Sequence, residues 1–311
     1  MKFFKRKSAR SGRLVLSRNG TDAIVGSIAP GEEKPRVTAC TLHALPQGSG
    51  PQWSALDKQI GLARHKCTIL LGPGEYQLMQ AEAPAVPAEE MRQALGWKIK
   101  DMLAYPVDEA VIEYVAIPQD PHAVGRAAHV YAISSRSTLI RQYMDDFDSI
   151  KAELDVIDIP ELAQRNISAL LEEPERCLAM LSFNDNGSLL TYTMGGELYH
   201  ARAFEISAGQ LAQSDKAAQD HMHERLLLEL QRSLDNFERQ FSHLSINKLV
   251  LAPVSGQAAL EEYLRENLYV PVHSLDLSEV MNLAAVEDLE NPAFQSRCFL
   301  ALGAALRPEA S

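Results

Sequence analysis

The 311-residue sequence contains few cysteines, and no two of them lie close together. Cys40, Cys67, Cys177 and Cys298 are scattered along the chain. Closely spaced cysteines are the usual sign of a disulfide scaffold or of a structural zinc site, so both classes are excluded. The pattern predicts reduced, mostly buried thiols in a cytoplasmic protein, with no metal site.

The sequence also lacks a long apolar run. Its best stretch, CFLALGAAL at 298–306, is far shorter than the roughly 20 apolar residues that a membrane-spanning helix needs. The basic start of the chain is not followed by the apolar segment of a secretory signal. These two absences predict a soluble protein that does not span a membrane.

Basic residues are scarce. The chain has 30 Lys and Arg against 41 Asp and Glu, which gives a formal net charge of −11. Nucleic-acid binding needs clustered Lys and Arg to contact phosphates, so no nucleic-acid partner is expected. The one basic cluster is MKFFKRK at 1–7, a pattern typical either of a solvated terminus or of peripheral contact with an anionic membrane.

Two stretches of the sequence share a strand–turn–strand pattern. RLVLSRNGTDAIVGSI at 13–28 and LSFNDNGSLLTYTMGGELYHAR at 181–202 both place Asn-Gly between apolar strands, and the second adds Gly195-Gly196. These dipeptides favour type I′ hairpin turns, because both central residues of such a turn need a positive φ. The repeated pattern predicts a duplicated hairpin.

Alternating helices and strands follow each hairpin. The first half continues with helical patterns at 52–66 and 137–155, and the second with a long helix at about 216–243 and a final helix at 292–306. One stripe of the long helix is apolar and consists of Leu226, Leu230, Leu234, Phe237 and Phe241. The length and the repeated order predict two related α/β lobes, residues 1–171 and 172–311.

This arrangement resembles the actin/Hsp70/sugar-kinase superfamily, in which duplicated lobes flank a nucleotide cleft. Four segments carry a closer resemblance: ALGWKIKDMLAYPVDEAVIEYVAI (94–117), LDVIDIPELAQRNI (154–167), LLTYTMGGELYHARAF (189–204) and ELQRSLDNFERQF (229–241). On these segments the sequence is similar to PilM-type proteins of type IV pilus assembly, and most to those of the MshI type from mannose-sensitive haemagglutinin (MSHA) pili. The resemblance implies a duplicated, two-lobed actin-like fold with a subdomain inserted into the first lobe at about 67–135.

The nucleotide motifs of the superfamily are degenerate in this chain. Each hairpin of the superfamily carries Asp-x-Gly-[Ser/Thr], whose Asp serves Mg²⁺ and whose Gly lets the backbone approach a phosphate. The residues at these positions and at the adenosine loop are Ser17, Asn19, Ser182, Asn184, Gly187, Ser255 and Gly256. Because both carboxylates are missing, we expect a non-catalytic protein without a cofactor, in which any ATP with Mg²⁺ would meet a degraded site.

Two other functions are compatible with the pattern. One is a nucleotide-dependent switch or ATPase, in which Asp22, Asp185 and Gly256 form a rearranged site. The other is a GspL-like cytoplasmic component of type II secretion, which shares the fold but has a different partner. A GspL-like protein is expected to continue into a membrane span, and these 311 residues contain none, which favours the PilM type.

The resemblance also implies partners. PilM-type proteins capture the cytoplasmic tail of a PilN-like bitopic inner-membrane protein in a groove between the first lobe and the inserted subdomain. The residues expected at this groove are Trp97, Tyr105, Pro106 and Val107. The alternative for them is purely structural, with Trp97 as a core anchor and Tyr105-Pro106 as a helix stop. The resemblance further implies contact with the pilus assembly ATPase and platform at the inner membrane of a Gram-negative bacterium, and a homo-oligomer stays open.

Overall fold

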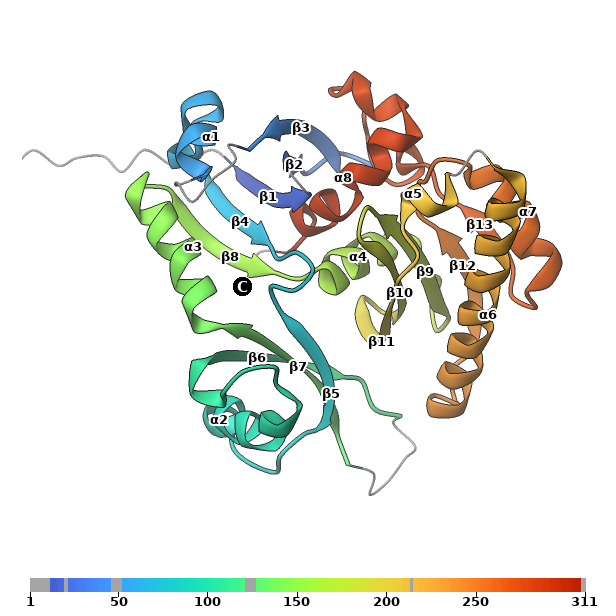
Figure 1. Ribbon diagram of the computed structural model, residues 1–311, viewed down its shortest axis with the longest axis horizontal. Coiled ribbons are helices and arrows are strands. Elements are labelled where there is room, and N and C mark those ends of the chain that lie inside the picture. Colours follow the sequence, from blue (N-terminus) through green and yellow to red (C-terminus); the bar gives the residue numbers. More distant parts are fainter. Residues whose placement is uncertain (1–11, 20–21, 46–51, 121–126, 213–214, 309–311) are drawn as a thin grey trace, which may run out of the picture.

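The first lobe contains a five-stranded sheet. The computed structural model describes residues 12–19, 22–45, 52–120, 127–212 and 215–308 (Figure 1). The strands of the first sheet are β1 (Arg13–Asn19), β2 (Asp22–Ala29), β3 (Arg36–Ala44), β4 (Lys66–Leu70) and β8 (Glu153–Asp158), in the order β3-β2-β1-β4-β8. The first three form an antiparallel meander, and β4 and β8 run parallel to β1.

Helices cover both faces of this sheet. Successive side chains of a strand point to opposite faces, so apolar residues of one strand join two different cores. Leu14 and Leu16 of β1 join the core under α1 (Gln52–Ile60) and α3 (Ser137–Ser149). Val15, between them, joins the core under α8 (Pro292–Ala305). Trp53 of α1 lies against Phe147 of α3, with ring centroids 5.9 Å apart, and this contact fixes the two helices on their shared face.

The second lobe repeats this topology. Its sheet has the order β11-β10-β9-β12-β13. The strands are β9 (Cys177–Asn184), β10 (Gly187–Met194), β11 (Glu197–Phe204), β12 (Ile246–Leu251) and β13 (Val272–Ser274), with helices α5 (Ala208–Leu211), α6 (Lys216–Gln240) and α7 (Gln257–Asn267). The apolar stripe of α6 is buried as predicted, and Phe237 stacks on Tyr192 of β10 at 4.2 Å between ring centroids. A meander followed by two parallel strands in each lobe confirms the predicted duplication.

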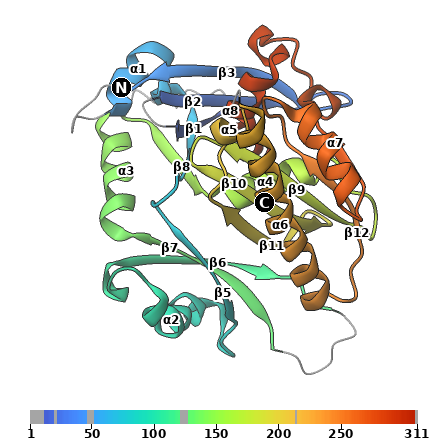
Figure 2. The same ribbon diagram turned by 45° about the vertical axis from the view of Figure 1, so that its right-hand side comes forward.

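Two helices cross between the lobes. Figures 1 and 2 show α4 (Pro160–Ser168) and α8 between the two large sheets. The chain enters α4 from β8 of the first lobe, but α4 packs on β9, β10 and β11 of the second. The chain enters α8 from the second lobe, but α8 packs on β1 and β2 of the first. The predicted boundary at 171/172 therefore does not separate two independent bodies, because each lobe is completed by a helix from the other half.

The two crossing helices approach each other closely at a glycine. A Cβ on Gly303 of α8 would lie 2.3 Å from the carbonyl oxygen of Ala163 in α4. The side-chain amide of Asn166 donates to the Gly303 carbonyl at 2.9 Å, and both groups are buried. Only a residue without a side chain allows the backbones to come this close.

The inserted subdomain is a three-stranded sheet covered by one helix. It contains β5 (Gln77–Glu82), β6 (Ala110–Ile117), β7 (His129–Arg136) and α2 (Ala88–Ile99), with the sheet order β5-β7-β6. The insertion begins later than the expected residue 67, because β4 pairs with β1 in the sheet of the first lobe. Gly72-Pro73-Gly74 lies where the chain leaves the first lobe for the inserted sheet.

The inserted sheet has an outer face and an inner face. Met79 and Ala132 point outward and form a small core with Ile99 of α2. Their neighbours Leu78 and Ile133 point inward and pack against the main core that the lobes share. In Figure 1, α2 lies on the side of this sheet away from the first lobe.

One of the predicted hairpin turns is confirmed, and another lies one residue earlier than predicted. Gly195 and Gly196 have φ values of 62° and 74°, and they connect the paired residues Met194 and Glu197, which confirms a type I′ turn. In the other hairpin Asn184 pairs with Gly187, so Asp185-Asn186 form the turn and Asn186-Gly187 do not. Gly187 is needed for a different reason, because a Cβ there would lie 2.5 Å from the Phe204 carbonyl oxygen. The turn at residues 20–21 lies outside the described residues.

Two predictions from absences can be compared with the structure. All four cysteines are buried free thiols, as expected. The apolar stretch 298–306 falls almost wholly in α8, where Phe299 and Leu302 are core residues. Within the described part of the chain, no helix has both the length and the apolar character needed to cross a bilayer. The basic cluster at 1–7 lies outside the described residues.

Replacing Gly303 with alanine is expected to destabilise the protein by about 1–3 kcal/mol, because the new methyl group would overlap the α4 backbone. The free energy of unfolding in urea measures the effect. Gly209→Ala is the matched control, because a Cβ there meets nothing nearer than the Ser207 hydroxyl at 4.0 Å. Equal stability of the two variants would contradict a close helix crossing.

Candidate functional site

One cavity lies between the two lobes. It has a volume of about 400 Å³. Its walls come from the ends of β1, β9 and β10, from the connection between β4 and β5, and from α4 and α8. Lining residues include Ser17, Leu71, Glu161, Asn184, Gly187 and Arg297. The cleft therefore joins both hairpins to both crossing helices, which is where the degenerate nucleotide motifs were expected to meet.

The two serines that stand in place of the motif carboxylates have different surroundings. Ser17 of β1 is half-buried and lines the cleft. Ser182 is buried outside it, where its hydroxyl donates to the side-chain oxygen of Gln164 at 2.5 Å. The amide nitrogen of Gln164 donates in turn to the Met180 carbonyl and the Thr191 hydroxyl. Ser182 is thus part of a saturated network that holds α4 on the second sheet.

The second hairpin turn is closed by its own side chain. The Asn184 side-chain oxygen accepts hydrogen bonds from the backbone amides of Asn186 at 2.8 Å and Gly187 at 3.0 Å. Backbone amides in such a turn are the groups that would cradle a phosphate. Here both donate to Asn184, so a phosphate would have to displace this side chain. Asn19 lies on β1 and pairs with Asp22.

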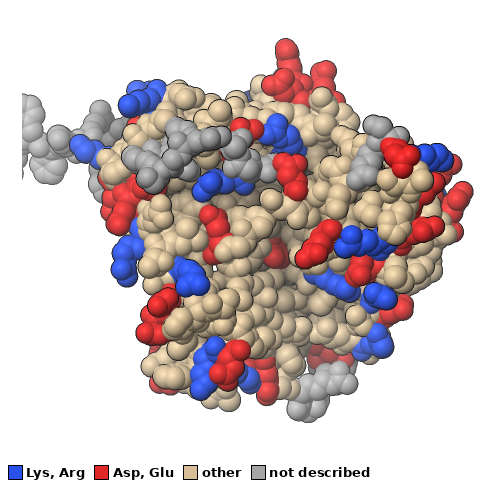
Figure 3. Space-filling model, viewed as in Figure 1, with Lys and Arg blue, Asp and Glu red and all other residues tan. Residues whose placement is uncertain are grey.

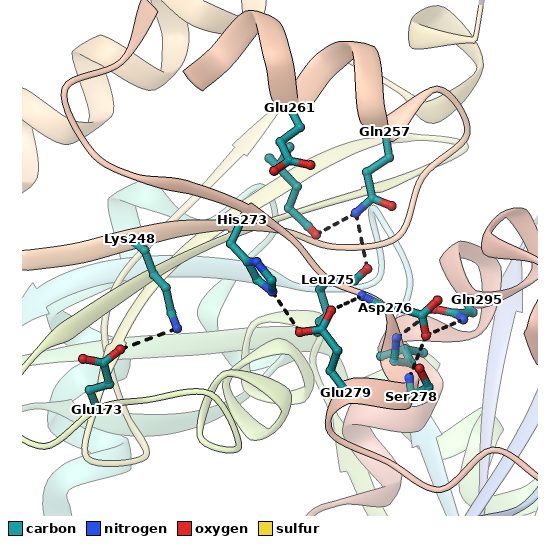
Figure 4. Close-up of polar contacts among 12 residues, drawn as sticks. Glu173, Lys248, Gln257, Glu261, His273, Leu275, Asp276, Ser278, Glu279 and Gln295 are labelled. Carbon is teal, nitrogen blue, oxygen red and sulfur yellow. Dashed lines mark hydrogen bonds and ion pairs between the residues drawn. The ribbon is translucent and has the colours of Figure 1, made fainter. Parts of the chain in front are cut away.

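The expected adenosine loop is separate from the cleft. Ser255 and Gly256 are exposed, and Gly256, with a φ of 76°, precedes α7. Figure 4 shows the neighbouring Gln257, whose side-chain amide donates to the carbonyls of Leu251 at 3.0 Å and Leu275 at 3.3 Å. This side chain covers the ends of β12 and β13.

The rearranged site of the switch alternative is not assembled. Asp22 forms an ion pair with Arg297 of α8 at 2.7 Å. Asp185 is exposed in the second hairpin turn. Asp22, Asp185 and Gly256 are all outside the lining of the cleft. In the described part of the chain, no group of three or more His, Cys, Asp or Glu side chains could hold a metal ion.

A buried carboxylate at the cleft was missed by the sequence analysis. Glu161, in the first turn of α4, is only 6% exposed and lines the cavity. The Tyr76 hydroxyl donates to its two carboxylate oxygens, at 2.9 and 2.8 Å. Burial raises the pKa of Glu161 above its usual range, and the bond from Tyr76 opposes this in part. In the sequence, Pro160-Glu161 follows a strand. Proline and an acidic residue are typical of the first turn of a helix, so this pair indicated a helix start and did not indicate a site.

Three hydrogen bonds to Glu75 hold the connection that carries Tyr76. Glu75 accepts from the Gly72 amide and from the Tyr143 hydroxyl of α3, both at 2.8 Å. The Ser135 hydroxyl of β7 donates to the Glu75 carbonyl at 2.7 Å. This wall of the cleft is therefore tied to the first lobe and to the inserted subdomain at once.

The expected groove residues lie on the outer face of the inserted subdomain. Trp97 of α2 is 63% exposed, so its alternative as a core anchor is wrong. The Tyr105 hydroxyl is 2.9 Å from the Ser134 hydroxyl, and the Arg136 guanidinium lies 4.4 Å from the centre of the Tyr105 ring. Val107, which follows Pro106, is placed beside Gly96 of α2. The inserted sheet separates this segment from the first lobe, so the segment does not line the junction between the two.

Exposed apolar residues occur on β6 and on α3, a helix that contacts β6 and β7. Val111 on the inner face of β6 is 38% exposed, and Met144 of α3 is 54% exposed. Val115 and Ile133 on the same inner face are partly buried against the main core. Figure 3 shows a broad area without charged side chains over the inserted sheet and its border with the second lobe. The strand order leaves β6 at an edge of the inserted sheet, paired within the described strands to β7 alone.

The inserted subdomain also contacts the second lobe. The Tyr131 hydroxyl of β7 accepts from the backbone amide of Ala201 in the edge strand β11 at 3.0 Å. Burial raises the pKa of Tyr131 to about 12, so this phenol is neutral at physiological pH. Asp120 and His243 lie 3.6 Å apart beside a smaller cavity of about 270 Å³ between the two bodies.

Comparison with known proteins reveals similarity at the level of structure. No family model and no curated protein matches the sequence. A chain of the solved PilM–PilN type IV pilus biogenesis complex superposes with a TM-score of 0.72 and 19% identity, over 96% of this chain and 100% of that one. A Bacteroides thetaiotaomicron protein described as having an actin-like ATPase fold and unknown function gives 0.53 and 9%, over 91% and 97%.

A third structure is less similar. The cytoplasmic domain of EpsL, an inner-membrane component of the Vibrio cholerae type II secretion system, gives a TM-score of 0.43 at 15% identity, over 67% of this chain and 77% of that one. The first two superpositions cover almost the whole chain. This chain therefore has the two-lobed α/β fold of the actin-like ATPases, as the sequence resemblance implied.

Glu161→Gln is expected to gain stability relative to the wild type as the pH rises above the ordinary glutamate pKa of about 4.3. The raised pKa lets the folded chain keep a proton that the unfolded chain loses near the ordinary glutamate pKa of about 4.3. Wild-type stability then falls through this window by about 1.4 kcal/mol per unit of pKa elevation, and glutamine does not titrate.

Urea unfolding of both proteins across this pH range tests the expectation. The exposed Glu82, which pairs with Lys98 at 3.1 Å, supplies the control variant Glu82→Gln. If the difference between Glu161→Gln and the wild type does not change with pH, Glu161 does not titrate as a buried acid.

Proposed function

We propose that this chain is a non-catalytic scaffold of type IV pilus assembly, of the MSHA type, that binds the cytoplasmic tail of a PilN-like bitopic inner-membrane protein. The observation that carries the proposal is the near-complete superposition on a chain of the PilM–PilN complex. The inserted subdomain is part of the matched region, because 96% of this chain is covered. Such a scaffold would be cytoplasmic and held at the inner membrane by its partner.

The surroundings of the hairpins support a non-catalytic role. A magnesium–nucleotide complex needs carboxylates or water held by them, and hydroxyl side chains are weak substitutes. Ser182 is committed to Gln164, and Asn184 occupies the amides of its own turn. We therefore propose that the hairpins are structural parts of the two cores and that the protein neither turns over ATP nor depends on it.

The tail would bind at the junction of the first lobe and the inserted subdomain. Val111 and Met144 expose apolar surface there, on a strand and a helix that flank the junction. The free edge of β6 offers backbone groups to an extended peptide, and the apolar side chains beside it offer pockets for alternate residues. This location replaces Trp97, Tyr105, Pro106 and Val107 as the contact surface.

Other partners follow from the same role. The scaffold would connect its membrane partner to the pilus assembly ATPase and platform. The alternative GspL-like role shares the fold and would be distinguished by which membrane protein supplies the tail. The basic cluster at 1–7 would add peripheral membrane contact.

Met144→Glu is expected to weaken binding of a peptide from the PilN-like cytoplasmic tail by about tenfold or more, because it places a charge on the proposed contact surface. Trp97→Ala is the matched control, since both residues are exposed on helices and Trp97 lies on the outer face. Calorimetric titration of the three proteins with the peptide measures this. Loss of binding in Trp97→Ala alone would move the site to the outer face, and no wild-type binding would reject the proposed partner.

Titration with fluorescent ATP and Mg²⁺ is expected to show no saturable binding up to millimolar nucleotide. The physical reason is the missing pair of carboxylates together with the closed turn at Asn184. Displacement by unlabelled ATP controls for nonspecific binding of the dye. Tight, magnesium-dependent binding would contradict the scaffold and favour the nucleotide-dependent switch.

A further inference from the structure

Three groups form a hydrogen-bonded chain between the inserted subdomain and the second lobe. The Tyr131 hydroxyl of β7 accepts from the backbone amide of Ala201 in β11 at 3.0 Å, and it lies 3.4 Å from Nδ1 of His200 on the same strand. Tyr131 is only 3% exposed, so water does not satisfy its hydroxyl. Because the oxygen already accepts from Ala201, the single hydrogen of the phenol is left to donate to Nδ1 of His200.

This arrangement requires one chemical form of His200. Nδ1 accepts a hydrogen bond only when it carries no proton, so His200 is neutral with its proton on Nε2. A proton on Nδ1 would turn this acceptor into a donor. The Tyr131 hydrogen would then have no acceptor in the described part of the chain. A buried donor without a partner is destabilising, so protonation of His200 opposes the contact.

The surroundings of His200 also disfavour its charged form. Burial, and then the charge of Arg202, lower the pKa of His200 below its ordinary value of about 6.5. The ring of Tyr192 in β10 lies against the imidazole, with ring centroids 5.8 Å apart. A lowered pKa means that this contact is fully stabilised above about pH 6.5 and is weakened as the pH falls through the lowered value.

Charged groups of the neighbouring elements are engaged in ion pairs of their own. Arg202 pairs with Glu229 of α6. Glu113 of β6, a strand that contacts β11, pairs with Arg92 at 2.8 Å. Neither carboxylate is therefore available to stabilise a charged His200.

Other titratable groups near the contact act in the opposite direction. His243 lies 3.6 Å from Asp120, so a proton on His243 would strengthen that ion pair, and the exposed His129 lines the cavity beside it. The charge of Glu161 in α4 acts on Tyr131, and burial raises the pKa of Glu161, so acidification neutralises this carboxylate readily in the folded chain. Neither the ion pair nor Glu161 would loosen the contact as the pH falls.

We propose that the chain Ala201–Tyr131–His200 is a pH-sensitive clasp, which holds the inserted subdomain on the second lobe while His200 is neutral and releases it when Nδ1 of His200 is protonated. Release would free the Ala201 amide in the edge strand β11. The proposal stands on this contact alone and involves neither the tail nor the interlobe cleft, so its failure leaves the proposed function intact.

Hydrogen exchange of the Ala201 amide measures the clasp directly. Its protection, corrected for the pH dependence of intrinsic exchange, is expected to fall about threefold or more between pH 7 and pH 5 in the wild type. His200→Asn places an amide oxygen, an acceptor that does not titrate, near the position of Nδ1, and it is expected to keep its protection at pH 5. The matched control is His223→Asn, because burial also lowers the pKa of His223 but this side chain lies against Tyr263, away from the clasp. This control is expected to lose protection at Ala201 as the wild type does.

NMR of the wild-type imidazole nitrogens supplies a measurement that needs no variant. At pH 7 the proton of His200 is expected on Nε2, with Nδ1 unprotonated. A proton on Nδ1 at pH 7 would overturn the proposal, as would protection of Ala201 that does not change with pH. Loss of protection at pH 5 that persists in His200→Asn would also overturn it, because the titrating group would then lie elsewhere.

Discussion

The close crossing of α4 and α8 is the contact on which the rest of the molecule depends. Gly303 lets the α8 backbone approach Ala163, and the Asn166 side chain bonds across the crossing. Each helix follows the strands of one lobe and completes the core of the other. The lobes therefore share a buried centre, and residues from both halves of the chain line the cleft. Glu161 faces the cleft because it begins one of these two helices.

The duplicated hairpins retain the architecture of a nucleotide-binding fold with different local chemistry. In the second hairpin the hydroxyl of Ser182 serves Gln164, and the side chain of Asn184 satisfies two backbone amides. Such saturation stabilises a buried polar group and removes its capacity for an incoming ligand. The meanders themselves have a structural role, because their strands form part of both cores.

The inserted subdomain connects the cleft with the junction at which we propose that the tail binds. Its inner face packs on the main core. The Ser135 hydroxyl donates to the Glu75 carbonyl in the connection beside the cleft, and the Tyr131 hydroxyl accepts from the Ala201 amide in the edge strand of the second lobe. A partner at the junction would therefore act on an element that contacts both lobes. Its outer face, with Trp97 exposed, is separated from these contacts by the sheet.

Much of the fold follows from local patterns in the sequence. The apolar stripe of α6, the Gly195-Gly196 turn and the repeated meanders depend on nearby residues, and each was predicted correctly. Only the tertiary structure decided which surfaces meet. The sequence pattern around Trp97 is typical of a core residue, but Trp97 is exposed. Strands β4 and β5 follow one another in the sequence but join different sheets. The sequence shows Glu161 only as a residue in the first turn of a helix, and not that its carboxylate is buried at the cleft. The physical reason is that periodicity shows which side of an element is apolar, whereas burial, pairing and charge depend on the distant segment packed against it.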